Sequence, residues 1–231
     1  MLFTFLLTAG GANAATPGNS PITVVELYTS QGCSSCPPAH TVVGDLVDQA
    51  GVLPLSFHVD YWDYLGWKDP FASPVHTARQ RVYGQQFKIG YVYTPQIVVQ
   101  GKFQGTGSDR RKIHGYIAQA KSLPHIAIKL MQQGESLRAT FPVTSLDAYQ
   151  GKLDVIAVYF DNQHETAIKR GENSGETLAS YNVVRKIERL GTWDGAAEQL
   201  PVPPLKGKGE NCVVILQSAV TGQIVGAALS P

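Results

Sequence analysis

The sequence predicts an α/β domain at residues 22–122, followed by a mainly antiparallel, β-sandwich-like domain at residues 126–231. Strand-like and helix-period segments alternate up to Leu123, whereas short strand-like runs separated by turn residues dominate after Pro124. The chain holds 23 glycines and 14 prolines, and only 16% of its residues are charged, which favours strands and turns over long surface helices. A chain of 231 residues is long enough for one large or two small domains with a substantial core.

The beginning of the chain resembles a secretory signal peptide. Residues 1–7 form an apolar run, and Ala12-Asn13-Ala14 is an A-x-A cleavage pattern. The positively charged start of a typical signal is missing, so a tail with chance alanines is the alternative. We predict a signal peptide at 1–14, a linker at 15–21 and a periplasmic or secreted protein. No later run reaches the roughly 18 apolar residues of a membrane span, so we expect no transmembrane segment after the signal.

Periodicity and turn residues indicate the elements of the α/β domain. β-branched residues dominate 22–28, and Ala39, Val42 and Leu46 have helical spacing. Pro37-Pro38 suits the first turn of a helix, because proline lacks the N–H group that later turns need. In chain order we expect a strand at 22–28, a helix from about 37 to 50, a strand at 53–59, an insertion at about 60–90 that includes a polar helix at 75–87, a strand at 92–99 and a helix at 108–123.

The second domain is indicated by short apolar runs at regular intervals. Turn signals such as Gln133-Gly134 and Thr221-Gly222 separate these runs, as in an antiparallel sandwich. We place the boundary between the domains at 122–125. The expected strands lie at 126–131, 137–142, 153–160, 166–170, 181–190, 212–217 and 223–228.

The net charge of +1 excludes a polybasic nucleic-acid-binding protein, and we expect no nucleic-acid partner. The charges are unevenly distributed, because residues 1–67 contain no lysine or arginine. A thiolate in this segment must therefore be stabilised by backbone N–H groups, by histidine or by cations from later in the chain.

Cys33-Ser34-Ser35-Cys36 is a CxxC motif between an apolar strand and the start of a helix. Such motifs serve zinc sites, haem attachment and redox turns. A zinc site needs about four ligands, whereas the third cysteine, Cys212, lies far away in an apolar run that indicates a buried side chain. Haem attachment needs a histidine where Pro37 stands. A helix N-terminus stabilises the thiolate that attacks in disulfide exchange, so the motif predicts a redox-active pair.

Thr94-Pro95 begins a second stretch that bears on function, a strand that ends at Gly101. Together with the CxxC motif it resembles the thioredoxin superfamily, whose fold places a cis-proline beside the cysteines. The resemblance implies a thioredoxin-like fold for residues 22–122, and it implies that Thr94 and Pro95 contact the bound substrate segment. An ordinary trans proline on an edge strand is the alternative.

Longer stretches are similar to one particular family. Residues 24–40 and 58–70 resemble DUF1223, a family of secreted bacterial thioredoxin-like proteins, and 170–175 and 182–185 resemble its C-terminal portion. The resemblance covers nearly all of the mature chain. It implies a fold and a CxxC pair but no particular substrate, so the expected function rests on the chemistry of the motif.

The two cysteines are expected to have different roles. Cys33 precedes the helix and should be a partly exposed nucleophile, while Cys36 should be more buried and resolve the mixed disulfide. Thioredoxins carry a buried carboxylate just before the motif that helps to move the proton of the buried cysteine, and Glu26 resembles that group. A solvent-exposed glutamate at a strand end is the alternative.

Further candidates follow the second strand. His58, Asp60 and Trp62 alternate at its end, on the side where open α/β sheets bind ligands. Asp60 and Trp62 are therefore candidate substrate-binding residues, and core packing is the alternative for the aromatic side chains. We expect His40 to lie at the surface, and we expect the polar cluster at 170–176 to be a turn network.

Three functions remain open. The first is an exported thiol–disulfide oxidoreductase that acts on protein or small-molecule thiols, leaning towards reductant or isomerase, with an exported thiol or disulfide client as its partner and no cofactor. The second is a copper-binding or copper-handling thioredoxin-fold protein, in which Cys33 and Cys36 join His40 or His58, because thiolates select Cu(I). The third is a binding module whose disulfide is static.

Overall fold

The computed structural model describes residues 21–134, 136–205, 207 and 209–231. The predicted signal peptide at 1–14 and all but the last residue of the predicted linker at 15–21 lie outside the described residues. Within the described part of the chain, no helix is long and apolar enough to cross a membrane.

The described residues form a mixed α/β fold with three α-helices and eleven strands. The helices are α1 (Pro37–Val47), α2 (Pro74–Gln86) and α3 (Arg110–Ala120), and short 3₁₀ turns lie at Asp63–Leu65 and Asp147–Tyr149. The strands are β1 (Thr23–Thr29), β2 (Val52–His58), β3 (Gln96–Val99), β4 (Phe103–Thr106), β5 (Lys129–Gln133), β6 (Ser136–Phe141), β7 (Leu153–Ala167), β8 (Thr177–Trp193), β9 (Glu198–Val202), β10 (Glu210–Ser218) and β11 (Ile224–Leu229).

One large sheet runs through both predicted domains, in the order β11-β10-β7-β8-β2-β1-β3-β4. Most neighbouring strands are antiparallel, whereas β2 is parallel to both β1 and β8. The junction lies where Ser56 of β2 is opposite Val183 of β8. There the Asn182 side chain donates to the Pro54 carbonyl at 2.8 Å, and the Ser56 hydroxyl donates to the Tyr181 carbonyl at 2.8 Å. The predicted boundary at 122–125 therefore divides the chain but not the sheet.

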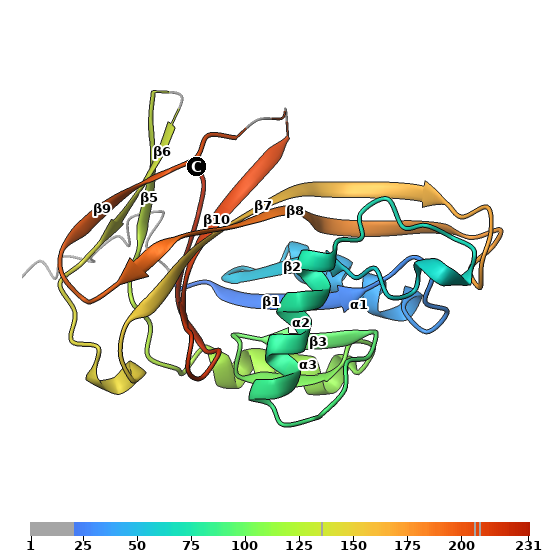
Figure 1. The fold of residues 1–231 in the computed structure, drawn as a ribbon, viewed down its shortest axis with the longest axis horizontal. Coiled ribbons are helices and arrows are strands. Elements are labelled where there is room, and N and C mark those ends of the chain that lie inside the picture. The colour runs from blue at the N-terminus through green and yellow to red at the C-terminus, as the bar shows by residue number, and fades with distance from the viewer. Residues whose placement is uncertain (1–20, 135, 206, 208) are drawn as a thin grey trace, which may run out of the picture.

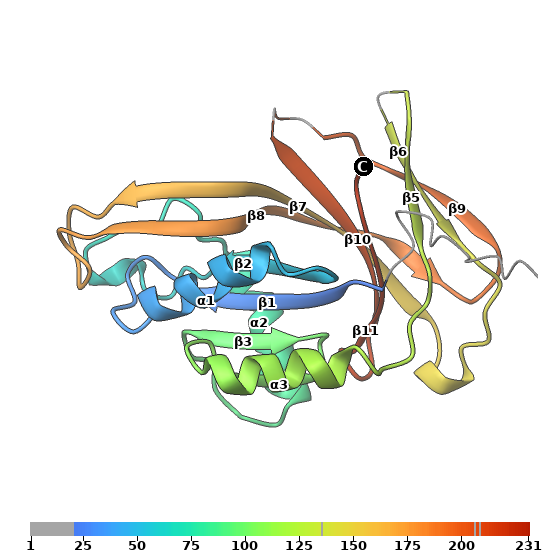
Figure 2. The ribbon, with the colours of Figure 1, turned by 180° about the vertical axis from the view of Figure 1, so that it is seen from behind.

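The helices cover the two faces of the β1–β4 part of the sheet. Successive side chains of a strand point to opposite faces. Val25 and Leu27 of β1 accordingly belong to a buried cluster with α1 and α3, whereas Val24 and Tyr28 pack in a second cluster that includes Tyr83 of α2. Figure 1 shows α2 across one face, and Figure 2 shows α1 and α3 on the other.

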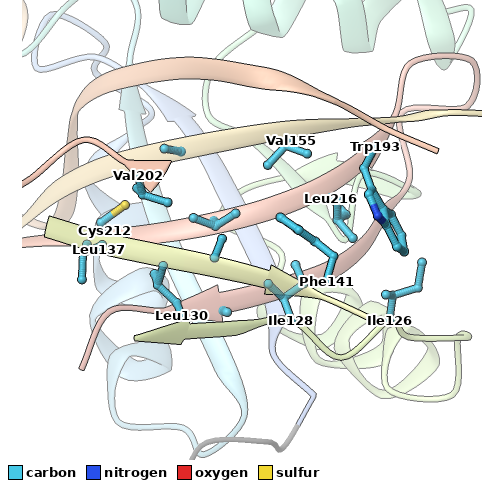
Figure 3. Packing of buried hydrophobic residues seen from close by; sticks show 14 of the residues in the cluster. Ile126, Ile128, Leu130, Leu137, Phe141, Val155, Trp193, Val202, Cys212 and Leu216 are labelled. Atoms are coloured by element: carbon cyan, nitrogen blue, oxygen red, sulfur yellow. The ribbon is translucent and has the colours of Figure 1, made fainter. Parts of the chain in front are cut away.

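A smaller sheet completes the β-rich part, with β6 between β5 and β9. Its apolar side chains pack against those of β7, β10 and β11 in a third buried cluster, so this end of the molecule has two layers of strands (Figure 3). Trp193 is the largest side chain in the cluster and is fully buried. Cys212 lies in the same cluster, as its apolar run predicts.

The structure adds strands that the sequence did not predict and lengthens others. β4 and β9 are short and only partly buried, and they contain Gly105 and Pro201, so neither has the apolar alternation of a half-buried strand. β7 extends the predicted run 153–160 through the polar residues 161–165 to Ala167, so the predicted strand at 166–170 is wrong for residues 168–170, which lie in the connection between β7 and β8. Polar residues are tolerated in this extension because β7 beyond Asp161 pairs with β8 alone and leaves most side chains exposed.

Candidate functional site

Cys33 and Cys36 form a disulfide in the turn between β1 and α1, with Cα atoms 5.4 Å apart. The regular helix starts at Pro37, as the two prolines predict, and Cys36 is its N-cap residue. The backbone carbonyl of Cys36 accepts from the N–H groups of Ala39 and His40 at 2.9 and 3.3 Å. The first turn of α1 therefore fixes the second cysteine, while Cys33 belongs to the preceding turn.

Both cysteines are buried, which corrects the expectation that Cys33 is partly exposed. Cys33 is 1% exposed and Cys36 is fully buried. Residues 168–176, which connect β7 to β8 and are called the tip loop below, contact the backbone of this turn. Asn173 of this loop donates from Nδ2 to the Cys33 carbonyl at 3.0 Å, and the Glu172 carboxylate accepts from the Ser34 N–H at 3.3 Å.

The segment around Thr94 borders the disulfide on another side, and the Thr94-Pro95 peptide bond is cis. The exposed Ser35 hydroxyl lies 3.4 Å from Cys33 Sγ and donates to the Thr94 carbonyl at 3.5 Å. Trp62 donates from Nε1 to the Thr94 hydroxyl at 2.7 Å. The structure therefore brings together the cysteine pair, Thr94 and Trp62, all of which were named as site candidates from the sequence.

Asp60 is engaged by α2. The Asp60 carboxylate accepts from the Thr77 hydroxyl at 2.6 Å, and the Asp60 backbone N–H donates to the hydroxyl oxygen of Thr77 at 3.3 Å. The half-buried Asp60 side chain thus fixes the loop after β2 to the start of α2.

Glu26 is buried, but it lies on the other face of the sheet from α1. Its neighbours Val24 and Tyr28 on β1 pack with α2, whereas Val25 packs with α1. The carboxylate accepts from Arg79 Nε of α2 at 2.8 Å. The structure therefore gives Glu26 a partner in α2 and does not bring it to the cysteine pair.

A buried polar cluster lies beneath the CxxC turn, at the ends of β1 and β2. Asp69 accepts from the Gln31 N–H at 2.8 Å and bonds to His58 Nδ1 at 2.7 Å. Burial acts to raise the pKa of Asp69, but the attraction of His58 and the hydrogen bonds outweigh it, so this pKa lies below its usual value. Trp67 donates from Nε1 to the Gln31 side chain at 2.9 Å. The cluster thus holds the backbone just before Cys33.

His40 is buried in this cluster, which corrects the prediction of a surface position. Its Nδ1 bonds to the Ala179 carbonyl at 3.0 Å, and its Nε2 bonds to the Thr29 hydroxyl at 2.8 Å. Because a carbonyl only accepts, Nδ1 carries the proton and Thr29 donates to Nε2. Burial, followed by the neighbouring His58, lowers the pKa of His40 to about 4. The imidazole is therefore neutral at neutral pH and supplies no positive charge to a thiolate.

The two histidines that were named as alternative copper ligands differ in their contacts. Both ring nitrogens of His40 have partners, whereas His58 bonds to Asp69 through Nδ1 and its buried Nε2 has no hydrogen-bond partner among the described residues. Among the residues that the structure describes, no group of three or more His, Cys, Asp or Glu side chains could hold a metal ion.

Several residues of the site carried no signal in the sequence. Gln31 and Asp69 stand in irregular segments, where no periodicity indicates burial. The polar cluster at 170–176 was noticed, but its expected role was a turn network. The loop does close on itself, since the Ile168 N–H donates to the Glu176 carbonyl at 2.9 Å, and it also reaches the cysteine pair through Asn173.

Solved structures resemble this fold. A crystal structure of a protein from Agrobacterium tumefaciens is 31% identical, with a TM-score of 0.78, and the match covers 93% of this chain and 95% of that chain. HBP35 of Porphyromonas gingivalis is 16% identical, with a TM-score of 0.56, and the match covers 93% of this chain and 76% of that one. No curated protein matches the chain. The model of the family described as "Protein of unknown function (DUF1223)" matches residues 24–217, and the chain therefore belongs to that family.

Proposed function

We propose that the protein is an exported thiol–disulfide oxidoreductase, in which β1–β4 and α1–α3 make up a thioredoxin-like unit. The observation that carries the proposal is the Cys33–Cys36 disulfide at the start of α1, beside the Thr94-Pro95 segment. Cys36 is the N-cap residue of α1, the position in which helix N–H groups stabilise a thiolate. Thr94 and Trp62 are the proposed contacts for the client, and no organic cofactor is required.

The proposed reaction moves two electrons between a client and the cysteine pair. A client thiolate attacks Cys33 Sγ, the bond to Cys36 breaks, and the electron pair leaves on Cys36 Sγ, which takes up a proton. A second client thiolate then attacks the client sulfur of the mixed disulfide, which forms the client disulfide and releases the Cys33 thiolate. In the reverse direction Cys33 attacks a client disulfide and Cys36 resolves the intermediate.

The charges around the pair support a lean towards reduction or isomerisation of clients. Strong oxidants stabilise their reduced form through a very acidic thiol. Among the described residues, the hydrogen-bond partners of residues 31–36 include the carboxylates of Asp69 and Glu172 and include no lysine or arginine. His40 is neutral at neutral pH. A Cys33 thiol that titrates several units below a free cysteine would contradict this lean.

The test is capture of the client in the exporting cell. Cys36→Ser leaves Cys33 without its resolving partner, so mixed disulfides with clients accumulate and are identified after non-reducing separation. The matched control is Cys33→Ser/Cys36→Ser, which retains the fold and has no nucleophile in the site. Adducts that form in the single variant and are absent in the double variant support the proposal. An adduct-free Cys36→Ser, together with a wild-type pair that stays oxidised in a glutathione buffer, would refute it.

A binding module with a static disulfide is the second candidate, and the burial of both cysteines favours it. A structural disulfide resists reduction by the glutathione pool, whereas a redox-active one exchanges with it. The measured reduction potential of the pair separates the two candidates. A potential below about −300 mV would support the static disulfide.

A further inference from the structure

We infer that the tip loop at 168–176 controls access to Cys33, and that Asn173 is the latch that holds this loop closed. The inference assigns a role to the β7–β8 hairpin, and it rests on the proposed function in the sense that a client must reach Cys33 Sγ. It concerns residues outside the CxxC motif and outside the segment that carries it.

The first support is the double contact of one side chain. Asn173 donates from Nδ2 to the Gln31 carbonyl at 2.9 Å and to the Cys33 carbonyl at 3.0 Å, so both amide protons are used. The side chain is only 7% exposed although it belongs to a loop. Glu172, the preceding residue, accepts from the Ser34 N–H at 3.3 Å. The loop therefore holds the CxxC turn along its backbone, on either side of Cys33 itself.

The second support is the contrast between the base of the hairpin and its tip. The base is fixed by the pairing of β8 with β2 and by contacts with Phe71. The centroid of the Phe71 ring lies 4.7 Å from the ring centroid of His164 on β7 and 5.0 Å from the guanidinium carbon of Arg185 on β8. The tip is mostly exposed, apart from Ile168 and Asn173. The backbone of the tip comes close to Trp67, which follows β2 in the chain, at Gly171. A Cβ atom added to Gly171 would lie 3.2 Å from the Cβ of Trp67.

Few interactions therefore need to break for the tip to lift. The hydrogen bonds of Asn173 and Glu172 join the tip to the CxxC turn, while the loop is closed internally by the bonds between Ile168 and residues 175 and 176. Internal closure allows the loop to move as a unit without disturbing the β7–β8 pairing. Loops that gate an active site come from such locally stable, weakly attached segments.

Lifting the loop has a direct chemical consequence. Disulfide exchange requires the attacking thiolate to reach a sulfur atom, and access limits its rate. In the closed form Cys33 is 1% exposed, so attack requires prior opening. The observed rate constant for reduction is then the intrinsic rate constant multiplied by the fraction of molecules whose loop is open.

The test measures this rate on the purified full-length mature protein. The oxidised protein is mixed with dithiothreitol, samples are quenched with an alkylating reagent, and the reduced fraction is followed by mass. Asn173→Ala removes two hydrogen bonds and should raise the rate constant roughly 10- to 30-fold. Ser174→Ala is the matched control, because its exposed hydroxyl donates to the Lys169 carbonyl within the loop. The rate of this variant should stay within twofold of wild type.

A second variant keeps the test decisive if Asn173→Ala does not fold. Glu172→Ala truncates an exposed side chain and should raise the rate a few-fold by freeing the Ser34 N–H. Rates for the folded variants within twofold of wild type would overturn the inference. Because this assay uses a chemical reductant, its outcome does not depend on a client. The proposed function is judged separately by the capture experiment with Cys36→Ser, so either can fail while the other stands.

Discussion

Arg79 and Glu26 form an ion pair between α2 and β1, with Arg79 Nε 2.8 Å from Glu26 Oε1 and the carboxylate side chain 1% exposed. The guanidinium also donates to Gln217 at 3.0 Å and to Tyr83 at 3.2 Å. One side chain thus joins α2 to β1 and to β10, which come from both halves of the chain. The carboxylate that resembled a catalytic group in the sequence is part of this structural network.

Arg79→Ala should destabilise the fold by about 3 to 5 kcal/mol, because it leaves the Glu26 carboxylate buried without its partner. The free energy of unfolding from urea titration measures this effect. The double variant Arg79→Met/Glu26→Gln is the control, since it removes both charges at similar volume and should lose less. Equal losses in the two variants would show that packing, and not the unpaired charge, sets the cost.

Glu26→Gln should leave the pH dependence of disulfide reduction unchanged. The carboxylate is engaged by Arg79 and faces α2, away from the helix that follows the cysteines. The rate constant with dithiothreitol at several pH values, normalised to a small disulfide, checks this. A displaced pH profile in a folded Glu26→Gln variant would mean that Glu26 handles the proton of Cys36 after all.

Acidification should destabilise the protein between about pH 6.5 and 4. Burial is the main cause that lowers the pKa of His40 and of His76 to about 4, while an unfolded chain has histidines near 6.5. In this window the unfolded chain binds more protons, so stability falls as the pH falls, by up to about 1.4 kcal/mol per pH unit for each histidine.

His76→Asn tests this pH dependence, because it keeps a donor for the His58 carbonyl and removes one titrating ring. The slope of the unfolding free energy against pH should become shallower by up to about 1.4 kcal/mol per pH unit, which is the contribution of one proton. His114→Asn removes an exposed histidine and serves as the control. An unchanged slope in His76→Asn would contradict the assignment of the acid sensitivity to buried histidines.

Cys212 should resist alkylation in the native protein. It is fully buried, and burial, with smaller contributions from Glu210 and Glu188, raises the pKa of its thiol to about 12. Iodoacetamide at pH 8 should label it only after denaturation, as mass analysis would detect. Labelling of native Cys212 on the time scale of an unfolded control would show that the two-layered end of the molecule opens readily.

Trp62→Phe should preserve the aromatic packing and remove the donor to Thr94, which lies 2.7 Å away. We expect a stability loss of about 1 kcal/mol and fewer client adducts when the change is combined with Cys36→Ser. Tyr64→Phe is the control, because its side chain is largely exposed. Equal adduct yields in Cys36→Ser and in Cys36→Ser/Trp62→Phe would show that the hydrogen bond of Trp62 does not contribute to client binding.

Local patterns predicted the parts of the site that are local in the chain. The strand before the CxxC motif, the disulfide spacing and the helix start at Pro37 each depend on a few consecutive residues, and the structure has all three. Membership of the DUF1223 family was equally accessible, because it depends on stretches of consecutive residues.

Contacts between distant segments were beyond the reach of such patterns. His40 was expected at the surface, whereas Ala179 and Ser180 of β8 bond to its ring in the fold. Cys33 was expected to be partly exposed because it precedes the helix, and Asn173, which lies 140 positions away in the sequence, donates to its carbonyl in the fold. Neither partner has a spacing that relates it to the motif.

The junction between β2 and β8 has a consequence for any shortened form of the chain. Without residues after about 122, β2 would become an edge strand with the sequence VLPLSFH, whose side chains are all buried in the intact fold. A long apolar edge with unpaired N–H and C=O groups is a template for pairing with another chain. The later strands thus protect the cysteine-bearing part against self-association, and an isolated N-terminal half should precipitate or form oligomers.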